Sequence, residues 1–313
     1  MAVSPTTESI CRKIHDSRDD EKLITQTLVN LTQPECRQVR EAYKKTYGED
    51  LIQLLSNKFD QPPPSTCLML DPFERDAAAA RKALGQNDAV AVDYKALIEI
   101  LACRKSSHVL LILQAYRAKY GIRLETSIAA VEPPHPYQKI LTALTAAHKA
   151  HGADVSAHIA KCDARRLYET GIASATAIDE GVVVEIFSKR SIAQLKLTFL
   201  SYNRIYGQSY TSFLKNGGFG EFEEAVSVVA KCICSPPRFY AKVLYGCLKG
   251  TTIDEGAMVR VMVSRAEVDM NEIQKEFKKK YGIELKNMIC EILPHGNLRD
   301  FLVALANKTL INS

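Results

Sequence analysis

The stretch "EAYKKTYGEDL" (Glu41–Leu51) has three further copies along a chain of 313 residues. They are "QAYRAKYGIRL" (114–124), "LSYNRIYGQSY" (200–210) and "KEFKKKYGIEL" (275–285), and in each an aromatic residue is followed, four and five residues later, by Tyr-Gly. An Asp stands 23 residues before each leading aromatic, and successive aromatics are 73, 86 and 75 residues apart. One spacing that recurs four times predicts four structural repeats of about 70 residues.

Each repeat is predicted to contain a pair of consecutive helices. The Asp is a favourable N-cap for the first of them, and apolar residues follow it at helical spacing. The next helix carries the leading aromatic and ends at the Gly of Tyr-Gly, because a left-handed C-cap favours glycine. We interpret the tyrosines of these stretches as core residues. The Asp residues are Asp20, Asp93, Asp179 and Asp254; the leading aromatics are Tyr43, Tyr116, Tyr202 and Phe277; the glycines are Gly48, Gly121, Gly207 and Gly282.

An arginine follows the Asp after eleven residues in three of the repeats. These residues are Arg104, Arg190 and Arg265, whereas the first repeat has Leu31. A repeated arginine in a packed structure needs hydrogen-bond partners. We therefore predict that the three guanidinium groups bond acids or carbonyl groups near the end of the helix that the Asp opens.

The sequence predicts an all-α fold, because alternating runs of β-branched residues bounded by turns are absent. One helical repeat cannot bury its apolar face alone, so the four are expected to pack against one another. We place the repeats at 1–62, 63–147, 148–228 and 229–313. The Pro-rich "DQPPPSTC" (Asp60–Cys67) marks the first boundary, and "HKAHGADVSAHIAKCDARR" (His148–Arg166) is a longer connection into the third repeat.

The net charge of +5 favours anionic partners, but no Arg-rich block is present, so nucleic acid is not favoured. The N-terminal residues lack the basic and apolar regions of a secretory signal, and no apolar run reaches the roughly 18 residues of a membrane-spanning helix. Nine scattered cysteines are typical of free thiols in a reducing compartment. We expect a cytoplasmic protein and favour a monomer.

The stretch "LKGTTIDEGAMVRVMVSRAEVDMNEIQKEFKKKYGIEL" (Leu248–Leu285) resembles the fourth repeat of the annexin family along its whole length. "LDPFERDAAAARKAL" (Leu70–Leu84) and "AYKKTYGEDL" are similar to plant annexins in particular. The resemblance covers essentially the full chain. It implies four annexin-like repeats of about five helices each, packed into a curved disc whose convex face binds anionic phospholipid through Ca²⁺.

The resemblance also implies where Ca²⁺ would bind. In annexins a turn that reads Lys-Gly-x-Gly-Thr-Asp supplies backbone carbonyl oxygens, and an acid later in the repeat adds a carboxylate; both are ligands that Ca²⁺ prefers. The first three repeats depart from this pattern. Repeat one reads "HDSRDDE" (His15–Glu21), with Lys58 at the carboxylate position. Repeat two reads "GQNDAVAVD" (Gly85–Asp93), with Val131 at that position and Glu132 beside it. Repeat three has the stretched turn "ETGIASATAIDE" (Glu169–Glu180) and "NGGFGEF" (Asn216–Phe222) where the acid is expected.

The fourth repeat keeps most of the motif. Leu248, Lys249 and Gly250 are retained, Thr252 replaces the second Gly, and Glu291 lies one residue before the expected acid. The resemblance thus implies a Ca²⁺ site made by the carbonyls of Leu248, Gly250 and Thr252 with Glu291. Thr252 would adopt a turn conformation that favours glycine, so we expect weak affinity. The alternative is that Gly250 is only a turn residue and Glu291 only a solvated acid.

Basic side chains can replace part of the charge of the ion at an acidic membrane, where each contributes about 1 kcal/mol. Arg18, Lys58 and Lys249 lie near the loops and are candidate lipid-binding residues. We therefore predict a non-enzymatic, peripheral membrane-binding protein with weakened or atypical calcium dependence. The alternative is a scaffold for protein partners that has lost calcium-dependent membrane binding, and an enzyme acting through Cys or His is a third hypothesis.

Two sets of residues are candidates for other chemistry. Cys103 and Cys232 are similar to two cysteines of a sulfur cluster proposed for plant annexins, and inert packing is the alternative to a redox role. His148, His151, His158 and Cys162 have metal-like spacing, although a solvated connection also explains them. The His proposed to bind haem in plant annexins is replaced by Asn30, so we expect no haem site.

Overall fold

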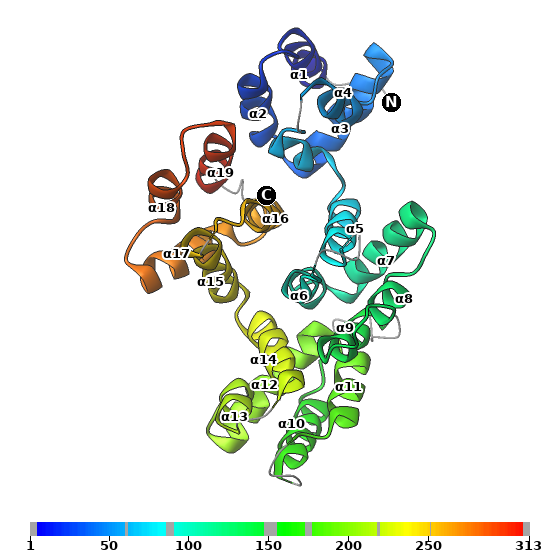
Figure 1. The fold of residues 1–313 in the computed structure, drawn as a ribbon, viewed down its shortest axis with the longest axis vertical. Helices are drawn as coiled ribbons and strands as arrows, with labels where there is room; N and C mark the ends of the chain where they lie inside the picture. Colours follow the sequence, from blue (N-terminus) through cyan, green and yellow to red (C-terminus); the bar gives the residue numbers. More distant parts are fainter. Residues whose placement is uncertain are drawn as a thin grey trace. The chain divides into compact units, whose positions relative to one another are not determined.

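The computed structural model describes residues 5–59, 62–85, 91–146, 155–172, 177–217, 220–250 and 252–308. Within these ranges every regular element is a helix and no strand occurs, which confirms the all-α prediction (Figure 1). No helix in the same ranges is both long and apolar enough to cross a membrane.

The helices of the described ranges form four successive sets of five. The first set is α1 (Pro5–Asp16), α2 (Glu21–Val29), α3 (Gln33–Tyr47), α4 (Leu51–Lys58) and the 3-10 helix η1 (Pro64–Met69). The second is α5 (Pro72–Ala83), α6 (Tyr94–Ala102), α7 (Ser106–Tyr120), α8 (Leu124–Ala129) and α9 (Tyr137–Thr145). The third is α10 (Ala157–Ile172), α11 (Glu180–Lys189), α12 (Ile192–Tyr206), α13 (Tyr210–Asn216) and α14 (Glu221–Cys234). The fourth is α15 (Pro236–Lys249), α16 (Glu255–Arg265), α17 (Met270–Tyr281), α18 (Leu285–Ile292) and α19 (Asn297–Asn307). We therefore propose that the repeats end after η1, α9 and α14, so that two of the limits, 62 and 228, move a few residues later.

The second helix of every repeat begins at the predicted aspartate. Asp20, Asp93, Asp179 and Asp254 are the N-caps of α2, α6, α11 and α16. Each carboxylate accepts a hydrogen bond from the backbone N–H three residues later, over 2.9–3.2 Å. The prediction of four equivalent caps is confirmed, and each cap satisfies an N–H that the helix itself leaves without a partner.

The third helix of every repeat also ends as predicted. Gly48, Gly121, Gly207 and Gly282 cap α3, α7, α12 and α17 with φ of 70–77°, which a residue with a Cβ rarely adopts. The four leading aromatics, Tyr43, Tyr116, Tyr202 and Phe277, have no exposed surface. Both predictions are confirmed.

The tyrosine of each Tyr-Gly pair was expected in the core but is only half-buried. Each of these tyrosines packs against a side chain of the first helix of its repeat. Three of these partners are stacked rings and the fourth is a guanidinium group: His15 on Tyr47 (3.9 Å), Tyr168 on Tyr206 (3.8 Å), Tyr245 on Tyr281 (3.7 Å) and Arg81 on Tyr120 (5.6 Å). The pair therefore joins the first and third helices as well as ending the third.

The three repeated arginines bond carboxylates, as predicted. Arg104 donates to Asp76 of α5 over 2.8 Å and Arg190 to Asp163 of α10 over 2.7 Å, both on the first helix of the same repeat. Arg265 bonds Asp269 instead, over 2.7 Å, and its guanidinium lies 4.7 Å from the ring centre of Tyr240 in α15. In the first repeat, Lys308 donates to the carbonyl oxygen of Leu31 over 2.6 Å.

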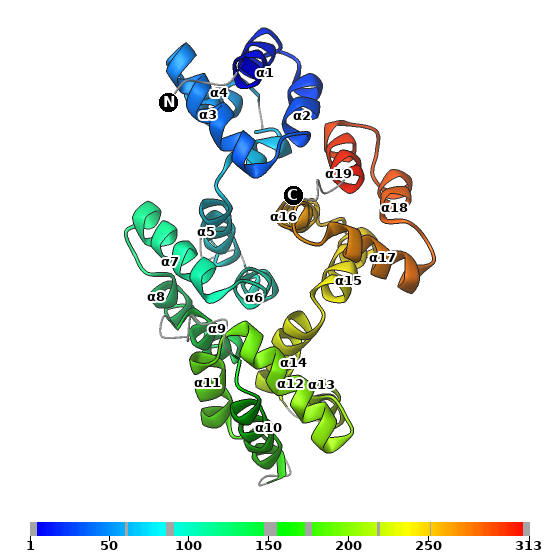
Figure 2. The same ribbon diagram turned by 180° about the vertical axis from the view of Figure 1, so that it is seen from behind.

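The chain divides into two compact units. One contains residues 1–75 and 240–313, thus repeats one and four, and the other contains residues 76–239, thus repeats two and three. In the first unit, α2 packs on α19 and η1 packs on α16 and α19; in the second, α6 packs on α14 and α9 packs on α11 and α14 (Figure 2). Second and fifth helices thus form the inter-repeat contact in both units, which explains why these helices carry so many buried apolar residues.

Candidate functional site

The turn between α15 and α16 is the part of repeat four that resembles a calcium-binding loop. It is closed by the N–H of Asp254, which donates to the carbonyl oxygen of Cys247 over 3.2 Å. A Cβ on Gly250 would lie 3.0 Å from the carbonyl oxygen of Thr252 and 3.1 Å from that of Gly246. The turn is therefore tight at Gly250, where a Cβ would need the neighbouring backbone to shift, and two carbonyl oxygens lie close by.

The strain expected at Thr252 is absent. Among the described residues, positive φ occurs at Gly48, Gly85, Gly121, Gly207 and Gly282 and at no residue with a side chain. Thr252 therefore holds its place in the turn without the left-handed conformation, and our reason for expecting weak affinity from that residue was wrong.

Glu291, the predicted carboxylate ligand, lies in the last turn of α18 and is exposed. In the described part of the chain it makes no hydrogen bond or ion pair, and no cluster of three or more His, Cys, Asp or Glu side chains able to hold a metal occurs there. A cation at this turn would thus depend on backbone carbonyls with one free carboxylate. This all-oxygen donor set fits a hard ion such as Ca²⁺.

Repeat one does not fit Ca²⁺, because the chain supplies its own cation there. The Nζ of Lys58, at the end of α4, lies 2.5 Å from Oδ1 of Asp19 in the turn between α1 and α2. This hydrogen bond lowers the pKa of the Asp19 carboxyl. An ammonium group thus stands where the family has a carboxylate, and it joins the same two segments that a metal ion would join. The predicted lipid-binding residues Arg18, Lys249 and Lys58 are all at exposed positions, but the Lys58 side chain is 27% exposed and paired with Asp19.

Lys58→Glu is expected to create a weak Ca²⁺ site in repeat one, with a Kd of about 10⁻⁴–10⁻³ M, because a second carboxylate would face Asp19. Calorimetric titration of the variant and the parent with Ca²⁺ measures the difference. Lys45→Glu, at an exposed position of α3, makes the same change of net charge and should add no site. Identical titrations for Lys58→Glu and the parent would contradict the interpretation.

The predicted turns of repeats two and three lie partly outside the described residues, at 86–90 and 173–176. In repeat two the ring of Tyr94 stacks on His135 at 4.4 Å, and the amide of Gln138 donates to the carbonyl oxygen of Val131 over 2.8 Å. In repeat three Glu223 is buried and accepts a hydrogen bond from the N–H of Ile178 over 3.0 Å. Glu223 is not among the residues that the motif predicts, although it lies directly after the Gly-rich stretch Asn216–Phe222 where an acid is expected.

The two candidate redox cysteines lie together. Cys103 is the C-cap of α6 and is half-buried, whereas Cys232 of α14 is fully buried. Their Sγ atoms are 2.6 Å apart, and no disulfide joins them. The two residues are 129 positions apart in the sequence, so their contact depends on the packing of repeat two against repeat three.

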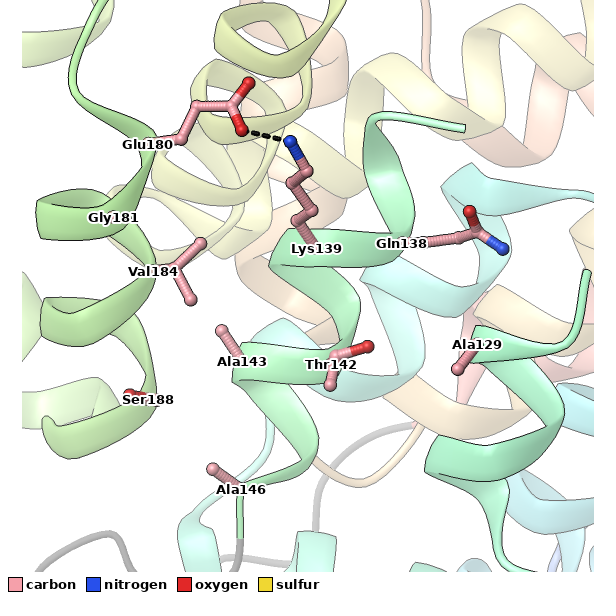
Figure 3. A pocket seen from close by; sticks show the side chains of 10 residues that line it. All are labelled: Ala129, Gln138, Lys139, Thr142, Ala143, Ala146, Glu180, Gly181, Val184 and Ser188. Carbon is pink, nitrogen blue, oxygen red and sulfur yellow. Dashed lines mark hydrogen bonds and ion pairs between the residues drawn. The ribbon is translucent and has the colours of Figure 1, made fainter. Parts of the chain in front are cut away.

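A groove of about 650 Å³ lies between α8, α9 and α11 (Figure 3). Lys139 and Glu180 point toward one another across one end and form an ion pair. Gln138 bonds backbone carbonyls, and the Ser188 hydroxyl donates to the carbonyl oxygen of Glu185 over 2.9 Å. Small side chains make up most of the remaining wall, so the groove presents a mainly alkyl surface.

Comparisons with known proteins agree with the helical repeats. A family model described as Annexin matches residues 75–144, 163–229 and 239–305, in repeats two to four. Annexin A13 of Mus musculus is 31% identical over 288 residues, covering 91% of this chain and 89% of that protein. Annexin-like protein RJ4 of Fragaria ananassa is 28% identical over 303 residues, covering 96% and 94%. The solved structure of annexin III has a TM-score of 0.86 and 28% identity, with 98% of this chain and 96% of that chain covered.

Proposed function

The chain belongs to the annexin family, and from this premise we propose that it binds anionic phospholipid membranes peripherally with weakened calcium dependence. Calcium-dependent phospholipid binding is the general activity of the family. The observation that carries the proposal for this chain is the Lys58–Asp19 ion pair, which replaces the metal in repeat one. The buried Glu223 in repeat three supports it, because its carboxylate already accepts a hydrogen bond from the N–H of Ile178.

Repeat four is the proposed place of the remaining Ca²⁺ site. The carbonyls of Leu248, Gly250 and Thr252 with the Glu291 carboxylate would hold the ion, which would supply positive charge to a lipid phosphate. Lys249 is exposed beside the turn and would add its own charge at an anionic surface. Arg18 would do the same in repeat one, where Lys58 is already paired with Asp19.

We propose that the protein is cytoplasmic and associates with membranes. We also propose that it catalyses no reaction, because annexins are generally non-enzymatic. The polar side chains around the α9–α11 groove support the second part, since Lys139, Gln138 and Ser188 are bonded within the protein. A scaffold that binds protein partners instead of lipid is the alternative that the membrane experiment below would reveal.

Liposomes of anionic phospholipid are expected to sediment the protein at low salt without Ca²⁺, and more of it when millimolar Ca²⁺ is added. The basic side chains act alone in the first case, and the repeat-four site contributes in the second. Neutral phosphatidylcholine liposomes are the control. Absence of sedimentation under every condition would favour the scaffold.

Glu291→Gln is expected to abolish the Ca²⁺-dependent part of sedimentation and most of the Ca²⁺ heat in calorimetry, because it removes the one carboxylate ligand. Salt-sensitive binding without Ca²⁺ should persist. Glu272→Gln on the exposed surface of α17 has the same change of charge and should behave as the parent. Equal Ca²⁺ binding by the parent and Glu291→Gln would place the site elsewhere.

The contact between Cys103 and Cys232 favours a second function, reversible oxidation of this pair. Peroxide is the oxidant class we propose. A thiolate at Cys103 would attack one peroxide oxygen to give a sulfenic acid, and the thiol of Cys232 would then displace water to give a disulfide. Two thiols and one hydrogen peroxide thus yield one disulfide and two waters.

A further inference from the structure

The first two turns of α10 place a histidine and a cysteine on one exposed face of the helix. The helix is held at its start by Ser156, whose Oγ accepts a hydrogen bond from the N–H of Ile159 over 3.2 Å. His158 and Cys162 follow at positions i and i+4, and both are exposed. Nε2 of His158 lies 3.7 Å from Sγ of Cys162.

This separation is the one that two ligands of a tetrahedral zinc ion have. A Zn–N bond of about 2.0–2.1 Å and a Zn–S bond of about 2.3 Å at a tetrahedral angle place the two ligand atoms about 3.6 Å apart. The pair in α10 would therefore take up an ion with little change in either side chain. A hydrogen bond between thiol and imidazole is the alternative explanation of the contact.

We propose that His158 and Cys162 chelate a soft divalent metal ion of the Zn²⁺ class. Nε2 of the neutral imidazole and the Cys162 thiolate are the ligands, and the thiol releases its proton on binding. The described surroundings contain no further cluster of ligating side chains, so water fills the other positions of the ion. His148 and His151 lie outside the described residues. The nitrogen and sulfur ligands distinguish this site from the all-oxygen turn of repeat four, which suits Ca²⁺.

Titration of the reduced, metal-free protein with Cd²⁺ tests the proposal, because a cadmium–thiolate bond absorbs in the ultraviolet. Zn²⁺ should then displace Cd²⁺, and excess Ca²⁺ should not. Cys162→Ser is expected to remove the absorption at low Cd²⁺. His158→Gln should weaken binding by at least about tenfold, since loss of even an outer-shell partner costs about 10–100-fold.

Cys290→Ser is the matched control, because Cys290 is another exposed cysteine, in α18. It should leave the affinity unchanged, and Glu291→Gln should do the same. Both proposed ligands are exposed, so the variants should keep the helical circular dichroism of the parent. Equal Cd²⁺ affinity for His158→Gln and the parent, or loss of binding in Cys290→Ser alone, would overturn the proposal.

Discussion

Replacement of Arg104 by Met is expected to lower the free energy of unfolding by about 3–5 kcal/mol. The Arg104 side chain is 11% exposed and its partner, the Asp76 side chain, is 6% exposed. Without the guanidinium, a buried carboxylate in α5 loses the 2.8 Å hydrogen bond from Nε and the opposite charge. Denaturant-induced unfolding of the variant and the parent measures the loss.

An exposed ion pair provides the control for this prediction. Arg123 and Glu125 lie 2.7 Å apart, but the arginine side chain is 64% exposed, so Arg123→Met should cost less than about 1 kcal/mol. The double variant Asp76→Leu, Arg104→Met removes both charges and should recover most of the stability, because the cost comes from the unpaired carboxylate. A double variant as unstable as Arg104→Met alone would show that packing, not charge, dominates.

The helix boundaries could be predicted because their causes are local. An Asp that accepts from the N–H three residues later, and a Gly with positive φ, act within one helical turn, so Asp254 and Gly282 could be assigned from spacing alone. The core position of Phe277 followed from the same period. The assignment of each cap and each buried aromatic was strengthened by repetition, because the same spacing occurs in all four repeats.

The partners of the repeated arginines could be predicted only as a class. Arg190 reaches Asp163 of the first helix, whereas Arg265 bonds Asp269 only four residues away. The first helix of repeat four places Tyr240 against the guanidinium of Arg265. Which carboxylate pairs with a given arginine depends on how two helices pack, and the residue spacing within one helix does not specify that packing.

The predicted calcium-binding loops also show that side-chain partners cannot be predicted from residue spacing alone. Lys58 stands at a position where the family has a carboxylate, and we predicted that it binds lipid. Its pairing with Asp19 could not be predicted, because it depends on the end of α4 lying close to the turn before α2. At Thr252, the analogy to glycine suggested strain, but the turn has no positive φ there. In both cases the family motif indicated the position, and the actual side chains determined the local chemistry.

Oxidation of the Cys103–Cys232 pair by hydrogen peroxide is expected to raise the free energy of unfolding by roughly 4–5 kcal/mol. A disulfide between them would close a span of 129 residues, and the chain-entropy estimate for a loop of about 100 residues is about 4.7 kcal/mol. The half-buried position of Cys103 gives peroxide access to one thiol, and the buried Cys232 is positioned to displace water from the sulfenic acid.

Denaturant-induced unfolding before and after peroxide, with peptide mapping of the disulfide, measures this effect, and a thiol reductant should reverse it. Cys103→Ser and Cys232→Ser should each abolish the stabilisation, whereas Cys290→Ser, which removes an exposed thiol, should not. Because each of the two serine variants also loses the contact of one sulfur, each must be compared with its own reduced form. If peroxide modified Cys162 or Cys290 while Cys103 and Cys232 stayed reduced, the contact in the core would be packing alone. A mapped disulfide that forms and reverses would instead establish that the junction of α6 and α14, which joins repeats two and three, responds to oxidant.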